Sequence, residues 1–252
     1  MNFVLSTHQA DLFLTEAPEV KDDELRQAMR WKVKDLIDYD LEDAVVDCFA
    51  IPGQRERGRQ PMAYVVSAAV DVVKAYVSSI EESHLQINSI DISAMAQRNV
   101  ASLLPEDKQG VAFLVLNQQH GLLSLTRDKA LYLARDLDVG YGHFANNQQP
   151  GNDLPAQTQQ TLDQIILEVQ RSMDYYERYF AQPSIQSLVI APLAKPIPGL
   201  IDYMAAQLGM QVRELDVNAL LGLDNELERE LQAMCLPAIG GALRVSSPSE
   251  QR

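Results

Sequence analysis

Three apolar runs follow one another closely between residues 111 and 139, and no other stretch of the chain constrains the fold as strongly. They read VAFLVLN, GLLSLT and ALYLARDLDV, and only short polar segments separate them. Apolar runs of this length are typical of β-strands, and segments this short connect strands that lie antiparallel to each other. The sequence therefore predicts an antiparallel meander of three strands.

Strand-like and helix-like segments alternate after the meander. A long helix is predicted from about Thr158 to Phe180, because apolar residues recur there on one face: Leu162, Ile165, Ile166, Val169, Met173 and Tyr176. A strand (SIQSLVIAP), a helix that ends at Gly209 and a further strand (MQVRELDV) follow. This alternation predicts an α/β fold.

The first hundred residues predict a similar alternation. Residues 2–6 and 11–15 look like a pair of short strands joined by a turn, and acidic residues from Asp22 onwards favour the start of a helix. A basic segment, residues 53–61, reads as the loop of a hairpin. The other elements expected before the meander are strands at 43–51, 62–70 and 85–93 and helices at 71–84 and 94–104.

A polar break, PEDKQG at residues 105–110, is the predicted domain boundary, because proline, glycine and charged residues gather there. The sequence thus divides into a first domain of residues 1–106, a second domain of residues 107–245 and a disordered tail of residues 246–252.

The chain is strongly acidic, with a formal net charge of −14 over 252 residues and an isoelectric point near 4.6. This charge argues against direct binding to nucleic acid or an anionic membrane, while a basic protein segment stays possible as a partner. No apolar run reaches the roughly 20 residues that span a bilayer, and the start lacks the features of a signal peptide, so we expect a cytoplasmic protein. Cys48 and Cys235 lie far apart in apolar sequence, which predicts buried free thiols and no metal site.

The element order of the second domain resembles one half of the actin-like ATPase (ribonuclease H-like) fold. Four stretches in a fixed order resemble the PilM family of type IV pilus assembly proteins, and within it the members that serve mannose-sensitive haemagglutinin (MSHA) pili. They begin with APEVKDDELRQAMRWKVKDLI, YVVSAAVDVVKAYVSSI, LVLNQQHGLLSLTRDKALYLARDLDVG and LVIAPLAKPIPGLIDYMAAQLG, and they cover most of residues 15–220.

This resemblance implies a two-domain actin-like fold whose first domain contains an inserted small subdomain of FtsA type and is abbreviated at its N-terminus. It also implies an adaptor on the cytoplasmic face of the inner membrane. The expected partner is the N-terminal tail of a PilN-like bitopic membrane protein, called MshJ in the MSHA system. Other platform proteins of pilus assembly are further expected partners.

Related proteins can hold ATP and Mg²⁺ in a cleft, and the resemblance places four residues of this chain there: Asn117, Gly121, Lys195 and Gly199. Asn117 stands where the family has an aspartate and Gln119 where it has a glycine, so the charge that Mg²⁺ favours is missing. Ala191 and Pro192 replace paired glycines, and proline lacks a backbone donor. We therefore expect a degenerate cleft with no cofactor, no catalytic residues and no ATP hydrolysis.

The resemblance also places the partner groove near the first long helix, bordered by Trp31, Lys34, Ile37 and Tyr39. Lys34 would then face carboxylates of the bound tail. For Trp31 the usual fate of tryptophan favours a different interpretation, an anchor in the core.

Two other functions stay open from the sequence. One is an ATP-binding member of the same pilus machinery that cycles between an open and a closed cleft. The other is the cytoplasmic domain of a type II secretion L-type protein, a class marked by a transmembrane helix after the domain.

Overall fold

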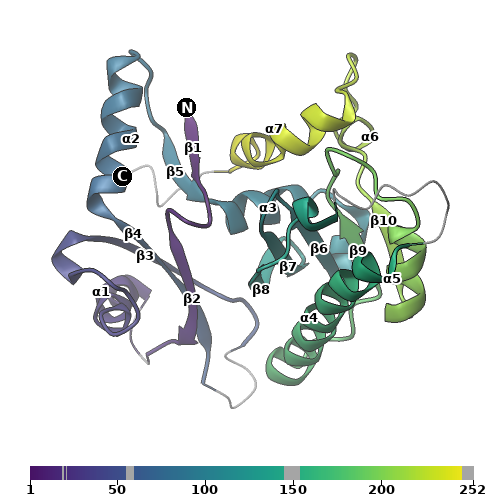
Figure 1. Ribbon diagram of the computed structural model, residues 1–252. Helices are drawn as coiled ribbons and strands as arrows, with labels where there is room; N and C mark the ends of the chain where they lie inside the picture. The colour runs from purple at the N-terminus through teal and green to yellow at the C-terminus, as the bar shows by residue number, and fades with distance from the viewer. Residues whose placement is uncertain (19, 21, 55–59, 145–153, 246–252) are drawn as a thin grey trace. The chain divides into compact units, whose positions relative to one another are not determined.

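The computed structural model shows two compact units, Met1–Ser93 (unit 1) and Ala94–Arg252 (unit 2), and each is described by itself (Figure 1). The described residues are 1–18, 20, 22–54, 60–144 and 154–245. The expected C-terminal tail, residues 246–252, and most of the basic loop, residues 55–59, lie outside them.

The division between the units falls at Ser93, ahead of the boundary predicted after residue 106. Helix α3 (Ser93–Ala101) is held in unit 2, because the side-chain amide of Gln97 donates to the carbonyl oxygens of Phe113 (2.7 Å) and Leu122 (3.0 Å). A Pro/Gly break in the sequence marks a turn, and these long-range contacts decide on which side of it a unit begins.

A small antiparallel sheet with strand order β2-β4-β3 forms part of unit 1. Its strands are β2 (Asp11–Glu16), β4 (Met62–Ala69) and β3 (Ala44–Ala50), and α1 (Asp22–Val33) packs on one face. Met29 and Val33 of α1 are fully buried against Ala63 and Val65 of β4. The short helix η1 (Leu41–Asp43) leads into β3.

The rest of unit 1 contains β1 (Asn2–Leu5), β5 (Ser89–Ile92) and α2 (Val70–Glu82). The predicted pairing of residues 2–6 with 11–15 is wrong, because β1 pairs parallel with β5, and β2 pairs along its whole length with β4. The ring of Phe3 in β1 packs on Tyr76 of α2 at 4.4 Å between centroids, which anchors β1 beside the helix.

Unit 2 is built on a five-stranded mixed sheet with order β10-β9-β6-β7-β8. The predicted meander is confirmed as antiparallel β6 (Val111–Leu116), β7 (Gly121–Arg127) and β8 (Ala130–Leu137). Strands β9 (Ser187–Ile190) and β10 (Gln211–Glu214) continue the sheet in parallel from β6.

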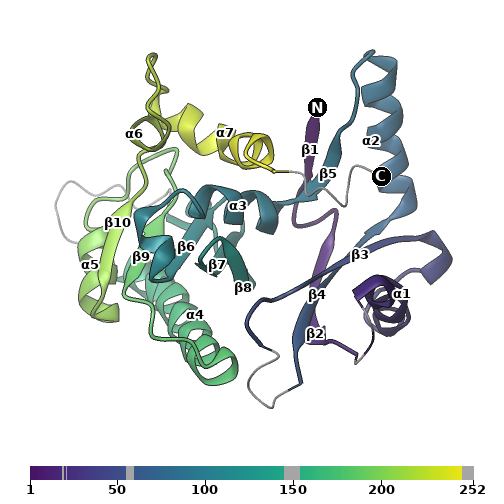
Figure 2. The ribbon, with the colours of Figure 1, turned by 180° about the vertical axis from the view of Figure 1, so that it is seen from behind.

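Helices cover both faces of this sheet (Figure 2). On one face lie α4 (Ala156–Phe180) and α5 (Leu200–Leu208), close to the predicted helices, and Gly209 ends α5 with a φ of 65°. On the other face α3, α6 (Val217–Leu221) and α7 (Arg229–Ala242) share one buried cluster with Phe113 and Val189. Short helices η2 (Pro105–Lys108) and η3 (Tyr141–Phe144) complete the unit.

Within the described ranges, no helix combines the length and the apolar character that a membrane span requires. The same residues contain no group of three or more His, Cys, Asp and Glu side chains that would hold a metal ion. Cys48 and Cys235 are free thiols as predicted, but both are half-buried rather than buried. Burial raises the pKa of the Cys48 thiol, with a smaller contribution from Asp47.

Candidate functional site

The turn between β6 and β7, residues 117–120, is the position of the expected phosphate turn. The backbone N–H of Asn117 donates to the carbonyl oxygen of His120 at 2.8 Å, which closes the turn. The side chains of Asn117, Gln118 and Gln119 are exposed, so the turn presents neutral amides to its surroundings. Mg²⁺ binds carboxylate and phosphate oxygens in preference to such groups, and none of these three residues supplies a carboxylate.

A second segment lies directly against this turn. The N–H of Tyr141 donates to the carbonyl oxygen of Asn117 (2.8 Å), and that of Gly142 donates to the carbonyl oxygen of Gln118 (2.9 Å). A Cβ atom at Gly140 would lie 2.3 Å from the carbonyl oxygen of Asn117, and one at Gly142 would lie 2.4 Å from that of Gln118. Both glycines are therefore required by close packing. The sequence interpretation missed them, although the spacing Gly-Tyr-Gly directly after a strand was a usable signal.

Gly121, expected at the cofactor, has a packing role at the start of β7. It is buried, and a Cβ atom there would lie 2.8 Å from Cδ2 of Leu116 and 3.0 Å from the carbonyl oxygen of Val139. A side chain at this position would be crowded by Leu116 of β6 and by the backbone that follows β8.

The loop after β9, residues 191–199, begins at the same end of the strands as the turn of residues 117–120, because β6 and β9 are parallel neighbours. Its first residues are packed inward: Ala191, Pro192 and Leu193 are buried, and the N–H of Leu193 donates to Oε1 of Glu214 at 3.2 Å. Lys195 is exposed, and Gly199 precedes α5 with a φ of 79°. The sheet thus brings the turn and this loop to the same end of its strands, and only the first three residues of the loop, among them the two at the expected paired glycines, are buried.

The expected partner residues of unit 1 fall into two groups. Trp31 is 64% exposed, so the prediction of a core anchor is wrong. Met29 and Val33 point into the core. Trp31 lies midway between them, and with about 3.6 residues per turn this places it on the opposite side of the helix. Lys34 is exposed just beyond the end of α1, and the neighbouring Leu36 is 46% exposed.

Ile37 and Tyr39 instead anchor this segment to the small sheet of unit 1. Ile37 packs on the core cluster beneath α1, and the Tyr39 hydroxyl lies 2.8 Å from Oγ of Ser67 in β4. Burial is the main cause that raises the pKa of Tyr39, and it also raises the pKa of the nearby Asp11 carboxyl, with Asp38 contributing. Of the expected partner residues, Trp31 and Lys34 are exposed, and so are the neighbouring Leu36, Asp35 and Asp38, which were not predicted.

The fold of this chain is similar to that of several proteins of known structure. No family model matches the chain, and no curated protein matches its sequence. A solved structure described as the PilM-PilN type IV pilus biogenesis complex is similar over 93% of this chain and 76% of that chain, with 19% identity and a TM-score of 0.70. The cytoplasmic domain of EpsL, an inner-membrane component of the type II secretion system of Vibrio cholerae, is similar over 94% and 72%, with 11% identity and a TM-score of 0.46.

A Bacteroides thetaiotaomicron protein of unknown function with an actin-like ATPase fold is similar over 90% of this chain and 69% of that chain, with 8% identity and a TM-score of 0.45. The similarity at a TM-score of 0.70 is the one that decides the architecture. The chain is an α/β protein with the actin-like ATPase fold.

Proposed function

We propose that this chain is a PilM-like adaptor of type IV pilus biogenesis, of the MshI type found in MSHA systems. It holds the N-terminal tail of a PilN-like inner-membrane protein, MshJ, at the cytoplasmic side of the membrane, where it also meets other platform proteins. The observation that carries the proposal is the similarity of almost the whole chain to PilM, which was solved as a complex with PilN. At this level of identity the similarity concerns the fold, so the role needs its own test.

The surface at the end of α1 supports a role in binding. Trp31 and Leu36 are large apolar side chains that stay exposed in the described chain, and Lys34 and Asp35 add one positive and one negative charge next to Leu36 in the sequence. Exposed tryptophan is typical of residues that dominate the energy of an interface. An apolar tail with a carboxylate near its apolar side chains fits this surface.

We further propose that the protein does not hydrolyse ATP. The support is chemical: the turn of residues 117–120 has amides in place of a carboxylate, and Ala191 and Pro192, both buried, stand where the family resemblance implies paired glycines. The adaptor role needs no turnover, because recognition of an extended tail relies on buried apolar groups and completed backbone hydrogen bonds.

The binding test uses Trp31 as a reporter, because it is the single tryptophan of the chain. A synthetic peptide with the N-terminal tail of the MshJ-like protein is titrated into the full chain. We expect a saturable blue shift of the tryptophan emission as Trp31 leaves water, and matching heats by calorimetry. Trp31→Ala, followed by calorimetry alone, should weaken binding about tenfold or more, as is typical of interface tryptophans.

The matched control is Leu85→Ala, because Leu85 is another exposed apolar residue of unit 1, at 50% exposure, outside the α1 surface. It should bind the tail as the unchanged chain does. If the protein is folded but calorimetry gives no heat of binding with the tail peptide and the tryptophan emission does not shift, the proposed function is wrong. Equal losses in both variants would move the binding surface away from Trp31.

A further inference from the structure

The last helix of unit 2, α7, has two contrasting faces. On the inner face Leu236 is buried in the cluster around Phe113, and Gly240 lies against the backbone of Ala96 in α3. Both ribbon views show α7 at the margin of unit 2, next to α3 (Figures 1 and 2). The opposite face of α7 therefore points away from the core of the unit.

The outer face of α7 is apolar, although surface helices normally carry charged side chains there. No residue from 231 to 243 is charged. Leu231 is 45% exposed and Met234 is 68% exposed. Four exposed residues follow one another along this face at spacings of three, four and four, and they are here called the α7 stripe: Leu231, Met234, Ala238 and Ala242. This is the spacing with which one helix packs along another.

The segment that leads into α7 is acidic and held in place by hydrogen bonds. The N–H of Leu227 donates to Oδ1 of Asn218 at 2.8 Å. Its carbonyl oxygen accepts from the side-chain amides of Asn218 and Gln232, each at 3.0 Å. Three acidic residues around this anchor are exposed: Glu226, Glu228 and Glu230.

These three carboxylates have no cation beside them. Within the described ranges, the ion pairs of the protein include none of the three. The arginine between them, Arg229, is already paired with Glu214 of β10. A basic group from outside would therefore find uncompensated negative charge at the start of α7.

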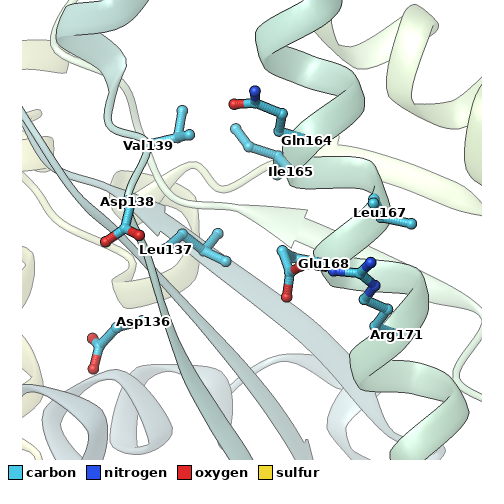
Figure 3. A pocket seen from close by; sticks show the side chains of 9 residues that line it. All are labelled: Asp136, Leu137, Asp138, Val139, Gln164, Ile165, Leu167, Glu168 and Arg171. Carbon is cyan, nitrogen blue, oxygen red and sulfur yellow. Dashed lines mark hydrogen bonds and ion pairs between the residues drawn. The ribbon is translucent and has the colours of Figure 1, made fainter.

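A pocket of about 490 Å³ between the end of β8 and the middle of α4 differs in this respect (Figure 3). Its Glu168 accepts hydrogen bonds from Arg171 on the same helix and from Arg135, each at 2.7 Å. The charge of this carboxylate is thus compensated within the unit, whereas the charges of the carboxylates at the start of α7 are not.

We propose that the α7 stripe docks a basic amphipathic helix of a partner protein. Apolar side chains of that helix pack on Leu231 and Met234, and the small Ala238 and Ala242 let the two helix axes approach closely. The bound helix runs antiparallel to α7. Lysine or arginine residues in its last turns, where the helix dipole favours cations, then face the acidic residues of segment 226–230. The stripe lies in unit 2, so this binding surface is additional to the α1 surface and does not depend on it.

A second copy of this chain fits the α7 stripe less well. The helix has 14 residues, which span about 21 Å, and a contact of that length and one helix wide is far smaller than the roughly 800 Å² per partner of a stable interface. Each copy also carries a formal net charge of −14, which opposes self-association and repels anionic lipid headgroups. A basic helix meets no such repulsion and suits a weak, transient contact.

The probe is a fluorescent peptide of about 18 residues, long enough to form a helix in water, with leucine and alanine on one face and lysine in its last two turns. It is titrated into the full chain and followed by anisotropy. Two further peptides have the same composition: one carries the lysines in its first two turns, and the other has a shuffled order without an apolar face. We expect saturable binding of the first peptide, weaker binding of the second and none of the third.

The apolar contact is tested with Leu231→Ser, which should weaken binding about fivefold because part of a leucine contact is lost. The matched control is Leu167→Ser, since Leu167 of α4 has the same exposed fraction, 45%, and lies outside the α7 stripe. The control should bind as the unchanged chain does.

The charged contact is tested with Glu228→Gln and Glu230→Gln combined. This double variant should weaken binding about threefold or more, and added salt should reduce the difference, as is typical of exposed ion pairs. Asp174→Asn combined with Glu177→Gln removes two acidic residues of α4 instead and should leave binding unchanged.

A local readout comes from Cys235, which is half-buried one turn after Leu231. The basic peptide should slow labelling of Cys235 by a maleimide and leave labelling of Cys48 in unit 1 unchanged. Absent saturable binding, equal weakening in the two leucine variants, or equal binding of the shuffled peptide overturns the proposal. So does a dimer in sedimentation that Leu231→Ser dissociates, or flotation with anionic vesicles that the same variant abolishes, since the occupant would then be a second copy or a lipid surface.

Discussion

At residue 117 the side chain decides the charge of the turn, while the neighbouring residues decide only the conformation of its backbone. The turn around it keeps a closed geometry, and Gly140 and Gly142 let the segment after β8 lie against its carbonyl groups. These contacts fix the shape of the turn that the family resemblance assigns to phosphate. They do not replace the negative charge that a bound Mg²⁺ requires.

We expect calorimetry with ATP and Mg²⁺ to show no binding at micromolar affinity. Asn117→Asp should not restore binding by itself, because Ala191 and Pro192, both buried, still replace the paired glycines. Thermal melting of both proteins provides the control for folding. Magnesium-dependent binding by the unchanged chain would contradict the proposed loss of ATP hydrolysis, and binding by the variant alone would place the whole defect at residue 117.

Helix α7 forms although its sequence contains residues that argue against a helix. It contains Pro237, Gly240 and Gly241, residues that normally interrupt a helix. In the structure a Cβ atom at Gly240 would lie 2.2 Å from the carbonyl oxygen of Ala96 in α3, and the Asn99 amide donates to the carbonyl oxygen of Gly240 at 2.9 Å. Glycine is thus present because two helix backbones touch there.

Because α3 and α7 are in contact, we expect glycine to be more stable than alanine at residue 240, the reverse of the usual preference in a helix. Alanine is favoured over glycine by about 1 kcal/mol inside a helix, yet Gly240→Ala should lower the free energy of unfolding by about 1–3 kcal/mol because of overpacking. Ala238→Gly, on the exposed side of α7, is the matched control and should cost only about 1 kcal/mol. Urea unfolding measures both, and a stabilised Gly240→Ala protein would show that the helices are not in contact.

At the scale of the whole unit, two ion pairs join segments that are far apart in the chain. Glu106 in η2 binds Arg213 of β10 through two hydrogen bonds of 2.7 and 3.0 Å. The hydrogen bond from Arg213 is the main cause that lowers the pKa of Glu106, and those from Arg135 and then Arg171 lower the pKa of Glu168. Both carboxylates therefore stabilise the folded state only while they are ionised.

The direction of these shifts fixes a pH dependence. A carboxylate with a lowered folded-state pKa contributes stability above its ordinary value of 4.5, and this contribution is lost as the pH falls through the lower, folded-state pKa. Glu106→Gln should therefore cost about 1 kcal/mol near pH 7, a small value because the pair is partly exposed, and almost nothing in strong acid. Urea unfolding across this pH range measures the difference, with Asp224→Asn as the control. A cost that stays constant in acid would contradict the role of this ion pair.

The sequence by itself determined the local elements. The meander, α4, and α5 with its terminal glycine followed from apolar periodicity and from turn residues, because neighbouring strands joined by short turns and single helices depend on contacts within a short stretch of chain. The family resemblance indicated the missing carboxylate at Asn117, and the sequence suffices for this because charge is a property of the residue.

The tertiary structure alone decided how distant segments meet. It paired β1 with β5 and β2 with β4, turned Trp31 outwards, and placed α3 in unit 2. It also showed that Gly140 and Gly240 are contact residues. Each of these outcomes depends on a partner remote in sequence, and the free energy of such a contact is fixed by the space and hydrogen bonds that the partner offers, which no local pattern records.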